Sequence, residues 1–362
     1  MNVEKISLRK NYSISRIIKG GWQLAGDHGD VQRRKAIGDM EIFLEAGIST
    51  FDCADIYVGV EEMLGEFIAS VRQKYGSSKA EEICIHTKLV PDLTKLQDIQ
   101  PNEIEAIVDR SLKRLRIDQL HLVQFFWWDL KLGKPVEALQ VLKKLQDKGK
   151  IKSLGVTNWE WFDIQPFIDS GMDIMSAQVQ YSVLDHRPKL EMVPWAEEKN
   201  ISLLCYGTLA GGFISEAWLG KEDPGFQFSN RSLVKYRLII DEFGSWDQFQ
   251  DLLRTLKEIG DWHQVALSSV AIRYILDQPQ IGAAIVGARY AKYLDDTLEV
   301  FRFSLTSEEH RQIKAKVDAS NGPSGPVYGL ERDRTSRHGR IMKYNLNSSP
   351  NDKIHAEKTQ YD

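Results

Sequence analysis

Three side chains near the ends of two apolar segments could carry acid–base chemistry. The stretch FDCADIY supplies Asp52 and Tyr57, and the run ICIHTKL ends close to Lys88. An ammonium at the end of a buried strand needs a counter-charge, which Asp52 on a neighbouring strand can provide. A cation beside Tyr57 would favour the phenolate by roughly 1–3 pK units from an ordinary pKa of about 10. The trio therefore predicts a tuned general acid, Tyr57; a plain buried ion pair beside a surface tyrosine is the alternative.

Short apolar runs that alternate with amphipathic stretches form the scaffold for these residues. The stretches 33–47 and 102–116 have apolar residues at three- and four-residue spacing, which is typical of helices. The apolar runs are short and bounded, as strands are. The predicted strands are 16–22, 49–54, 83–89, 120–126, 152–158, 176–182, 202–207 and 283–288.

Alternating strands and helices predict an α/β fold, a parallel sheet closed into a (β/α)8 TIM barrel. A doubly wound sheet is the alternative, but no G-x-G-x-x-G motif follows the first strand. We expect residues 1–320 to form the barrel. Residues 321–362 form a tail rich in Gly, Ser, Pro and charge, which we expect to dock in part through HGRIMKYNL and to be mobile over its last dozen or so residues.

The catalytic face of such a barrel lies at the C-terminal ends of its strands. A long insertion, 211–262, follows the seventh predicted strand and contains a helical pattern at 246–260. Loops of this length at that face tend to fold over bound ligands. The sequence therefore predicts long loops around a site built from strand ends.

Composition excludes several classes of protein. The formal net charge of −4 gives no basic excess, so we expect neither nucleic acid nor a membrane as a partner. We find no apolar run long enough to span a bilayer, and three scattered cysteines suit a reducing compartment. No two histidines have metal-ligand spacing. We expect a cytoplasmic protein with a small-molecule substrate and no metal; the oligomeric state stays open.

A family resemblance favours the catalytic interpretation of the trio. The segment GISTFDCADIYVGVEEMLGEFI resembles the signature of the aldo-keto reductase superfamily, and the likeness continues in IHTKL, RSLKRLRIDQLHLVQ, GKIKSLGVTNW, AQVQYS, CYGTLAGGFIS and AIVGARYAKYLDDTL. It covers nearly the whole predicted barrel. The resemblance implies a (β/α)8 oxidoreductase that transfers a hydride from a nicotinamide cofactor, usually NADPH, without a Rossmann fold.

The resemblance also implies roles for individual residues. Asp52, Tyr57 and Lys88 match the catalytic Asp, Tyr and Lys, and Tyr206 matches the aromatic residue that stacks on the nicotinamide ring. The implied cofactor-binding residues are Gly21, Trp22, Thr157, Asn158, Gln178, Tyr206, Gly207, Thr208, Leu209, Gly211, Gly287, Ala288 and Arg289.

One position departs from the family pattern. The fourth catalytic residue of the family is a histidine after the fourth strand, and alignment places Phe126 there. His121 cannot take its place, because it lies about 16 Å lower in the barrel by the usual rise per residue. Phe126 can pack but cannot donate a hydrogen bond. Three alternatives follow: slower carbonyl reduction, reduction of a C=N or C=C bond, or a catalytically weak regulatory protein that holds cofactor, similar to the potassium-channel β subunits. We favour an enzyme.

Aromatic residues surround the predicted site. Trp22, Phe126 and Trp127 are assigned to an apolar substrate pocket, whereas Trp128 and Trp159 are expected to pack under neighbouring loops. Arg289 and Lys292 could bind a 2′-phosphate, so the expected cofactor is NADP, with NAD possible. The basic residues of the tail are expected to form a solvated face rather than to close over the cofactor; they are Arg332, Arg334, Arg337, Arg340 and Lys343.

Overall fold

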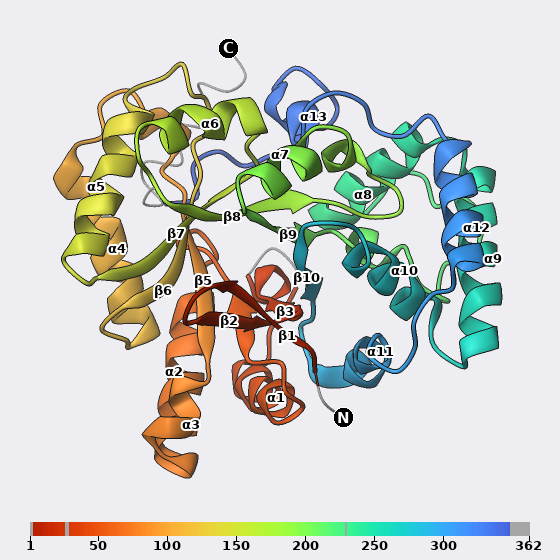
Figure 1. The fold of residues 1–362 in the computed structure, drawn as a ribbon, viewed down its shortest axis with the longest axis horizontal. Helices are drawn as coiled ribbons and strands as arrows, with labels where there is room; N and C mark the ends of the chain where they lie inside the picture. Colours follow the sequence, from red (N-terminus) through yellow and green to blue (C-terminus); the bar gives the residue numbers. More distant parts are fainter. Residues whose placement is uncertain (1–2, 26–28, 229, 348–362) are drawn as a thin grey trace.

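Parallel strands close into a barrel in the computed structural model, which describes residues 3–25, 29–228 and 230–347 (Figure 1). Each strand pairs in parallel with the next, and β10 returns to β3 to complete the ring. The (β/α)8 prediction is confirmed. The doubly wound alternative is wrong, because β3 and β10 would not pair with each other in an open sheet. The strands are β3 (Ile17–Gly20), β4 (Thr50–Asp52), β5 (Cys84–Leu89), β6 (Leu120–Phe125), β7 (Ile151–Thr157), β8 (Ile174–Gln180), β9 (Ser202–Tyr206) and β10 (Ile281–Gly287).

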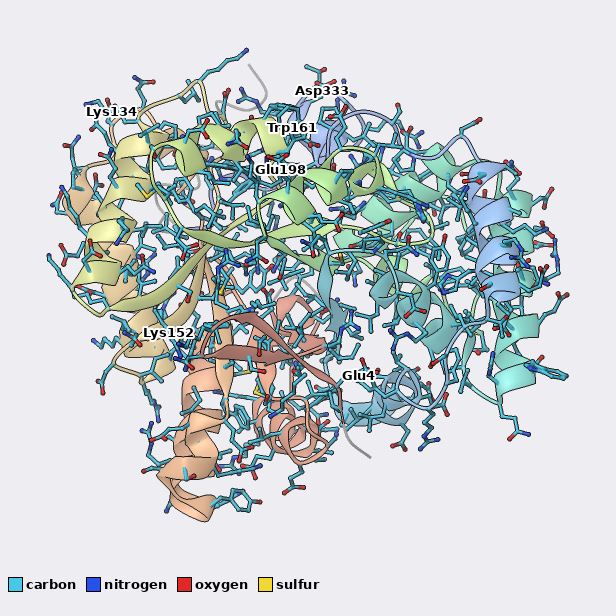
Figure 2. The ribbon with its side chains drawn as sticks, viewed as in Figure 1. Glu4, Lys134, Lys152, Trp161, Glu198 and Asp333 are labelled. Atoms are coloured by element: carbon cyan, nitrogen blue, oxygen red, sulfur yellow. The ribbon has the colours of Figure 1, made fainter. Side chains whose placement is uncertain are left out.

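Helices surround the barrel and bury their apolar faces against it. In α4, Pro101 occupies the first turn, Gln100 and Glu103 form a capping box, and Arg116 ends the helix in the left-handed conformation. Side chains fill the space between strands and helices (Figure 2). The barrel helices are α1 (Arg33–Glu45), α2 (Val60–Tyr75), α3 (Ser77–Glu81), α4 (Pro101–Leu115), α5 (Pro135–Asp147), α6 (Trp161–Asp169), α7 (Met192–Glu198), α10 (Leu267–Leu276) and α11 (Leu294–Glu299).

An antiparallel hairpin that the sequence analysis did not predict closes the N-terminal end of the barrel. Its strands are β1 (Lys5–Arg9) and β2 (Tyr12–Ser15), joined at Asn11, which has a φ of 66°. Leu8, Tyr12 and Ile14 pack with inward-facing strand residues in one apolar cluster. The alternating pattern KISLRKNYSIS was its signal. The barrel is therefore sealed opposite its catalytic end.

The insertion after β9 forms two helices, α8 (Arg231–Phe243) and α9 (Trp246–His263). The helical pattern at 246–260 predicted α9, which starts with a capping box between Ser245 and Gln248. The sequence analysis missed α8. After α12 (Ser307–Asp318), the chain crosses the barrel mouth through the short helix α13 (Gly329–Arg332). We call residues 323–347 the C-terminal segment; the end expected to be mobile lies outside the described residues.

No helix in residues 3–25, 29–228 and 230–347 has the length and apolarity needed to cross a membrane.

Packing between α2 and α4 leaves no room for a side chain at Gly65. A Cβ added there would lie 2.2 Å from the carbonyl oxygen of Arg114. We therefore expect Gly65→Ala to lower the free energy of unfolding by about 1–3 kcal/mol, measured by urea denaturation. The control is Gly38→Ala in α1, where a Cβ meets nothing within 4 Å; it should add about 0.5–1 kcal/mol. Equal effects of the two variants would contradict this packing.

Candidate active site

The ends of β4 and β5 bring two opposite charges together inside the barrel mouth. Asp52 is the last residue of β4, and Lys88 lies on the adjacent β5. Lys88 Nζ lies 2.6 Å from Asp52 Oδ1 and donates a second hydrogen bond of 2.8 Å to the Cys53 carbonyl. Both side chains are about 95% buried. Burial alone lowers the pKa of Lys88, but Asp52 and Tyr57 outweigh it and hold that pKa above its ordinary value.

Two glutamines satisfy the second oxygen of the Asp52 carboxylate. Gln178 Nε2 donates to Asp52 Oδ2 at 2.7 Å, and Gln124 Nε2 donates to the same atom at 3.2 Å. Gln178 also donates to Gln124 Oε1 at 3.0 Å. The sequence analysis missed Gln124, although a polar residue between Val123 and Phe125 in a buried strand was a usable signal. A four-residue network therefore holds the charges in place.

Tyr57 lies in the loop after β4, beside this network. The Lys88 ammonium is 5.0 Å from the centroid of the Tyr57 ring, and the Trp22 ring is 4.8 Å away. Burial raises the pKa of Tyr57 to about 12, although Lys88 acts to lower it. The expectation that the cation would favour the phenolate is therefore wrong in net effect, because desolvation of the phenol outweighs it. The phenol keeps its proton at neutral pH.

Phe126 follows β6 and packs among aromatic rings. Its amide donates to the Leu89 carbonyl, and its ring meets Trp128 edge-on at 4.8 Å. Trp127 is fully buried against Phe125, and its assignment to the substrate pocket stays a prediction. Trp128 instead lines a cavity of about 280 Å³. Trp159 is buried between Phe125 and Phe167, as expected.

The residues matched to the nicotinamide site lie together at the ends of β7, β8 and β9. Tyr206 Oη donates to Asn158 Oδ1 at 2.8 Å, and Asn158 itself has a φ of 60°. The Thr157 hydroxyl is buried and has no hydrogen-bond partner among the described residues. Gln178 Nε2 donates both of its hydrogen bonds, to Asp52 and to Gln124. The Thr157 hydroxyl is therefore left to donate to, or accept from, a further polar group.

The loop after β9 has the backbone expected of a phosphate cradle. Gly207 and Gly211 have φ values of 74° and 65°, and Leu209 and Ala210 lie between them. The Thr208 hydroxyl is buried without a hydrogen-bond partner among the described residues. Backbone amides and an unpaired hydroxyl suit anionic oxygens. These residues fit the pyrophosphate of a dinucleotide.

Helix α8 covers both of these regions. Lys235 Nζ lies 5.2 Å from the centroid of the Tyr206 ring, the ring on which the resemblance implies that the nicotinamide stacks. Tyr236 packs so closely on Gly207 that a Cβ there would lie 2.6 Å from its hydroxyl. Trp22 Nε1 donates to Ser232 at 2.9 Å, which ties α8 to the turn that follows β3. The polar residues therefore fit the cofactor, provided that Lys235 leaves the Tyr206 ring.

The end of β10 holds the residues matched to the adenosine phosphate. Gly287 lies so close to Gln23 that a Cβ there would be 2.2 Å from its amide nitrogen. The Ala288 carbonyl accepts a 2.9 Å hydrogen bond from Lys19 Nζ, and burial lowers the pKa of Lys19 to about 8. Arg289 follows at the partly exposed edge. Gly21 is fixed separately: its amide donates to the Asp52 carbonyl at 2.8 Å.

Arg332 does not belong to the solvated face predicted for the tail. Its guanidinium donates to the Asn158 carbonyl at 2.6 Å and to Asp163 at 3.0 Å. That expectation is wrong for Arg332, because the C-terminal segment docks on the strand ends. The other basic residues of the segment are exposed, namely Arg334, Arg337, Arg340 and Lys343.

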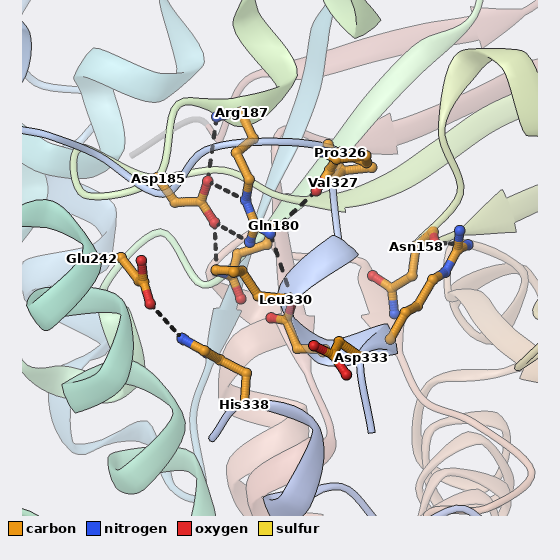
Figure 3. Close-up of polar contacts among 12 residues, drawn as sticks. Asn158, Gln180, Asp185, Arg187, Glu242, Pro326, Val327, Leu330, Asp333 and His338 are labelled. Carbon is orange, nitrogen blue, oxygen red and sulfur yellow. Dashed lines mark hydrogen bonds and ion pairs between the residues drawn. The ribbon is translucent and has the colours of Figure 1, made fainter. Parts of the chain in front are cut away.

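A buried carboxylate of the same segment joins the site. Glu331 lies 3.1 Å from Lys235 and 3.6 Å from Arg187. Arg187 also donates to Asp185 through two nitrogens at 2.9 and 2.7 Å (Figure 3). Neither Glu331 nor Lys235 was predicted, because contacts between an insertion and a tail have no sequence pattern. In the described part of the chain, no group of three or more His, Cys, Asp or Glu side chains could hold a metal ion.

Comparison with known proteins agrees with this geometry. The YhdN aldo-keto reductase of Bacillus subtilis (strain 168) is 26% identical over 324 residues, covering 87% of this chain and 93% of that protein. The NADH-specific methylglyoxal reductase of Escherichia coli (strain K12) is 22% identical over 333 residues, covering 85% and 96%. The structure of glycerol dehydrogenase AKR11B4 from Gluconobacter oxydans has a TM-score of 0.72 at 24% identity, covering 90% and 97%.

The family description "Aldo/keto reductase family" matches residues 16–318, which include every barrel strand and the Asp52–Lys88 pair. This chain therefore belongs to the aldo/keto reductase family of NAD(P)H-dependent oxidoreductases.

Proposed function

We propose that this protein reduces the carbonyl group of a small apolar or aromatic compound with NAD(P)H, and that Tyr57 is the proton donor. The observation that carries the proposal is the buried Asp52–Lys88 pair, 2.6 Å apart, beside the Tyr57 ring. Burying two charges costs several kcal/mol per ion before they attract each other. A pair kept at the catalytic end of a barrel, next to a protonated phenol, is a typical acid–base site.

Each member of the network has one task in this reaction. A bound nicotinamide supplies the hydride, which goes to the carbonyl carbon. Tyr57 Oη gives its proton to the carbonyl oxygen, which becomes a hydroxyl group. Lys88 stabilises the phenolate left behind, and Asp52 keeps Lys88 charged and in position. Gln124 and Gln178 fix Asp52.

Residues at the neighbouring strand ends would hold the cofactor. We assign the nicotinamide to Thr157, Asn158 and the face of Tyr206 after Lys235 moves, and the pyrophosphate to residues 207–211. Arg289 and Lys292 favour NADPH through a 2′-phosphate. NADH remains the alternative, since the Escherichia coli relative is NADH-specific.

Aromatic surfaces suggest the substrate class. Trp22 contacts Tyr57, and Phe126 and Trp128 form one continuous aromatic wall. Such a wall favours flat apolar or aromatic aldehydes and ketones. A C=N or C=C bond is a further possible target, because Phe126 offers no hydrogen bond.

A cofactor-holding protein with little turnover is the second candidate. Two features favour it: Phe126, which the resemblance aligns with the family's histidine, is apolar and 3% exposed, and Lys235 lies over the Tyr206 ring. Turnover separates it from the reductase, since both candidates bind a dinucleotide.

Fluorescence titration with NADPH and NADH, followed by NAD(P)H consumption with aldehydes, ketones, imines and enones, tests the proposal. We expect NADPH binding and turnover of at least one aromatic aldehyde. Tyr57→Phe should lower kcat by about 10²–10⁴-fold with an unchanged cofactor Kd, because only the proton donor is lost. Absence of binding to either cofactor would refute both candidates, and unchanged kcat in Tyr57→Phe would refute the proton donor.

The raised pKa of Tyr57 predicts the pH dependence of the reaction. A general acid is active while protonated and loses activity as the pH rises through its pKa, here about 12. We expect kcat for reduction to stay level from about pH 6 to about pH 10. Oxidation of the corresponding alcohol needs the phenolate and should instead accelerate with pH over this range. A decline in reduction near pH 8 would contradict the assignment.

Removal of the Asp52 charge should destabilise the fold as well as the site. Asp52→Asn leaves the Lys88 ammonium buried without its counter-charge, so we expect a loss of about 3–5 kcal/mol in the free energy of unfolding. The matched control is Asp173→Asn, which breaks the exposed pair with Arg9 and should cost less than about 1 kcal/mol. Urea denaturation of both variants is the measurement, and similar losses would show that the buried pair is not a constraint.

A further inference from the structure

The resemblance places Phe126 where the family has a histidine, and Phe126 cannot donate a hydrogen bond to the substrate's carbonyl oxygen. Its ring is buried and meets Trp128 at 4.8 Å. A second ring, that of Tyr328, meets it edge-on at 6.0 Å. Tyr328 lies on the C-terminal segment, far from Phe126 in sequence. A phenol is therefore packed against the position where a hydrogen-bond donor is missing.

Strong contacts on both sides hold Tyr328 in this place. The Val327 amide donates to the Glu160 carboxylate. Arg187 donates to the Pro326 carbonyl at 3.3 Å (Figure 3). On the other side, Arg332 is bound to Asn158 and Asp163. The segment is thus fixed to the ends of β7 and β8 within a few residues of Tyr328.

The backbone of Tyr328 adopts a conformation that tyrosine rarely takes. Its φ is 60° and its ψ is 11°, the left-handed region. This costs a residue with a side chain about 1–2 kcal/mol. The next residue, Gly329, could adopt it freely but does not have a positive φ. Strain of this kind persists where the surroundings fix a side chain in one place, and it often marks a functional site.

Tyr328 shares its surroundings with the proposed proton donor and the nicotinamide site. Lys235 Nζ lies 5.3 Å from the Tyr328 ring and 5.2 Å from the Tyr206 ring, so the two rings flank one ammonium. Burial raises the pKa of Tyr328 well above its ordinary value, and Glu331, Tyr344 and Tyr57 raise it further. Its hydroxyl keeps its proton and can donate. Tyr328 also lines the cavity of about 280 Å³ together with Trp128.

We propose that Tyr328 donates the second hydrogen bond to the substrate's carbonyl oxygen, in place of the histidine that Phe126 replaces. This inference rests on the proposed reductase function. Tyr57 transfers the proton, while Tyr328 keeps its own and stabilises the charge that develops on the oxygen. The C-terminal segment therefore supplies a catalytic residue to the barrel.

Three variants of the full chain test the proposal: Tyr328→Phe, Phe126→His and the double variant. Tyr328→Phe should lower kcat for an aromatic aldehyde by about 10- to 100-fold, with cofactor Kd and melting temperature unchanged. Phe126→His should restore most of this loss in the Tyr328→Phe background and gain less than about threefold in the wild-type background. Unchanged kcat in Tyr328→Phe, or equal gains in both backgrounds, would overturn the proposal.

Tyr344→Phe controls for docking of the segment. The Tyr344 hydroxyl donates to the Gly339 carbonyl at 2.9 Å, and its ring contacts Trp128. Phe126→His should rescue nothing that Tyr344→Phe loses, so rescue of both variants would also overturn the proposal. If Tyr328→Phe fails to fold, Phe126→His alone decides: a gain of more than about tenfold would mean that no second donor was present.

Aldehyde binding separates this inference from the proposed function. If the wild-type protein binds no cofactor or reduces nothing, the proposed function fails. A titration with benzaldehyde, in which quenching of tryptophan fluorescence measures binding, then tests Tyr328 without turnover. The Tyr328→Phe variant should bind about 3- to 10-fold more weakly, since one hydrogen bond is lost. Equal affinities of the two proteins would overturn the role of Tyr328.

Discussion

The buried ion pair between Asp52 and Lys88 is the interaction on which the site depends. Neither charge could remain inside the barrel without the other, because an unpaired buried ion would change its protonation state to become neutral or would draw in water. The pair also fixes the distance between β4 and β5 at their catalytic ends. Gln124 and Gln178 extend this constraint to β6 and β8. Strands on opposite sides of the barrel thus share one polar network, and the Tyr57 ring lies beside it.

Burial and charge act on Tyr57 in opposite directions, and burial dominates. A phenol that kept an ordinary pKa beside Lys88 would lose part of its proton in mildly alkaline solution. The buried phenol stays protonated, with a pKa of about 12, so in the proposed reaction the ammonium acts mainly on the phenolate that forms. Burial therefore makes the phenol a weak acid at rest, and Lys88 offsets part of the cost of forming the buried phenolate.

Sequence alone predicted the parts of the molecule that repeat or match a pattern. The barrel strands follow from short apolar runs, and the Asp52–Lys88 contact follows from adjacent strand ends. It did not predict how deeply Trp127 is buried, because one residue of shift after a strand decides which aromatic ring faces inward. The contacts of Lys235, Tyr328 and Glu331 were also beyond it, since they join an insertion to a tail. Such contacts depend on three-dimensional closure, not on local periodicity.

The docking of the C-terminal segment has a consequence for synthesis of the protein. The ribosome completes all eight barrel strands by residue 287, whereas the wall of the site that contains Tyr328 and Glu331 emerges later. Asn347 then ties that wall to the loops after β4 and β5, through Asp55 and the Val90 carbonyl. A chain interrupted between these points could close its barrel and still lack a finished site. Translation order thus keeps the reactive centre incomplete until the scaffold around it has formed.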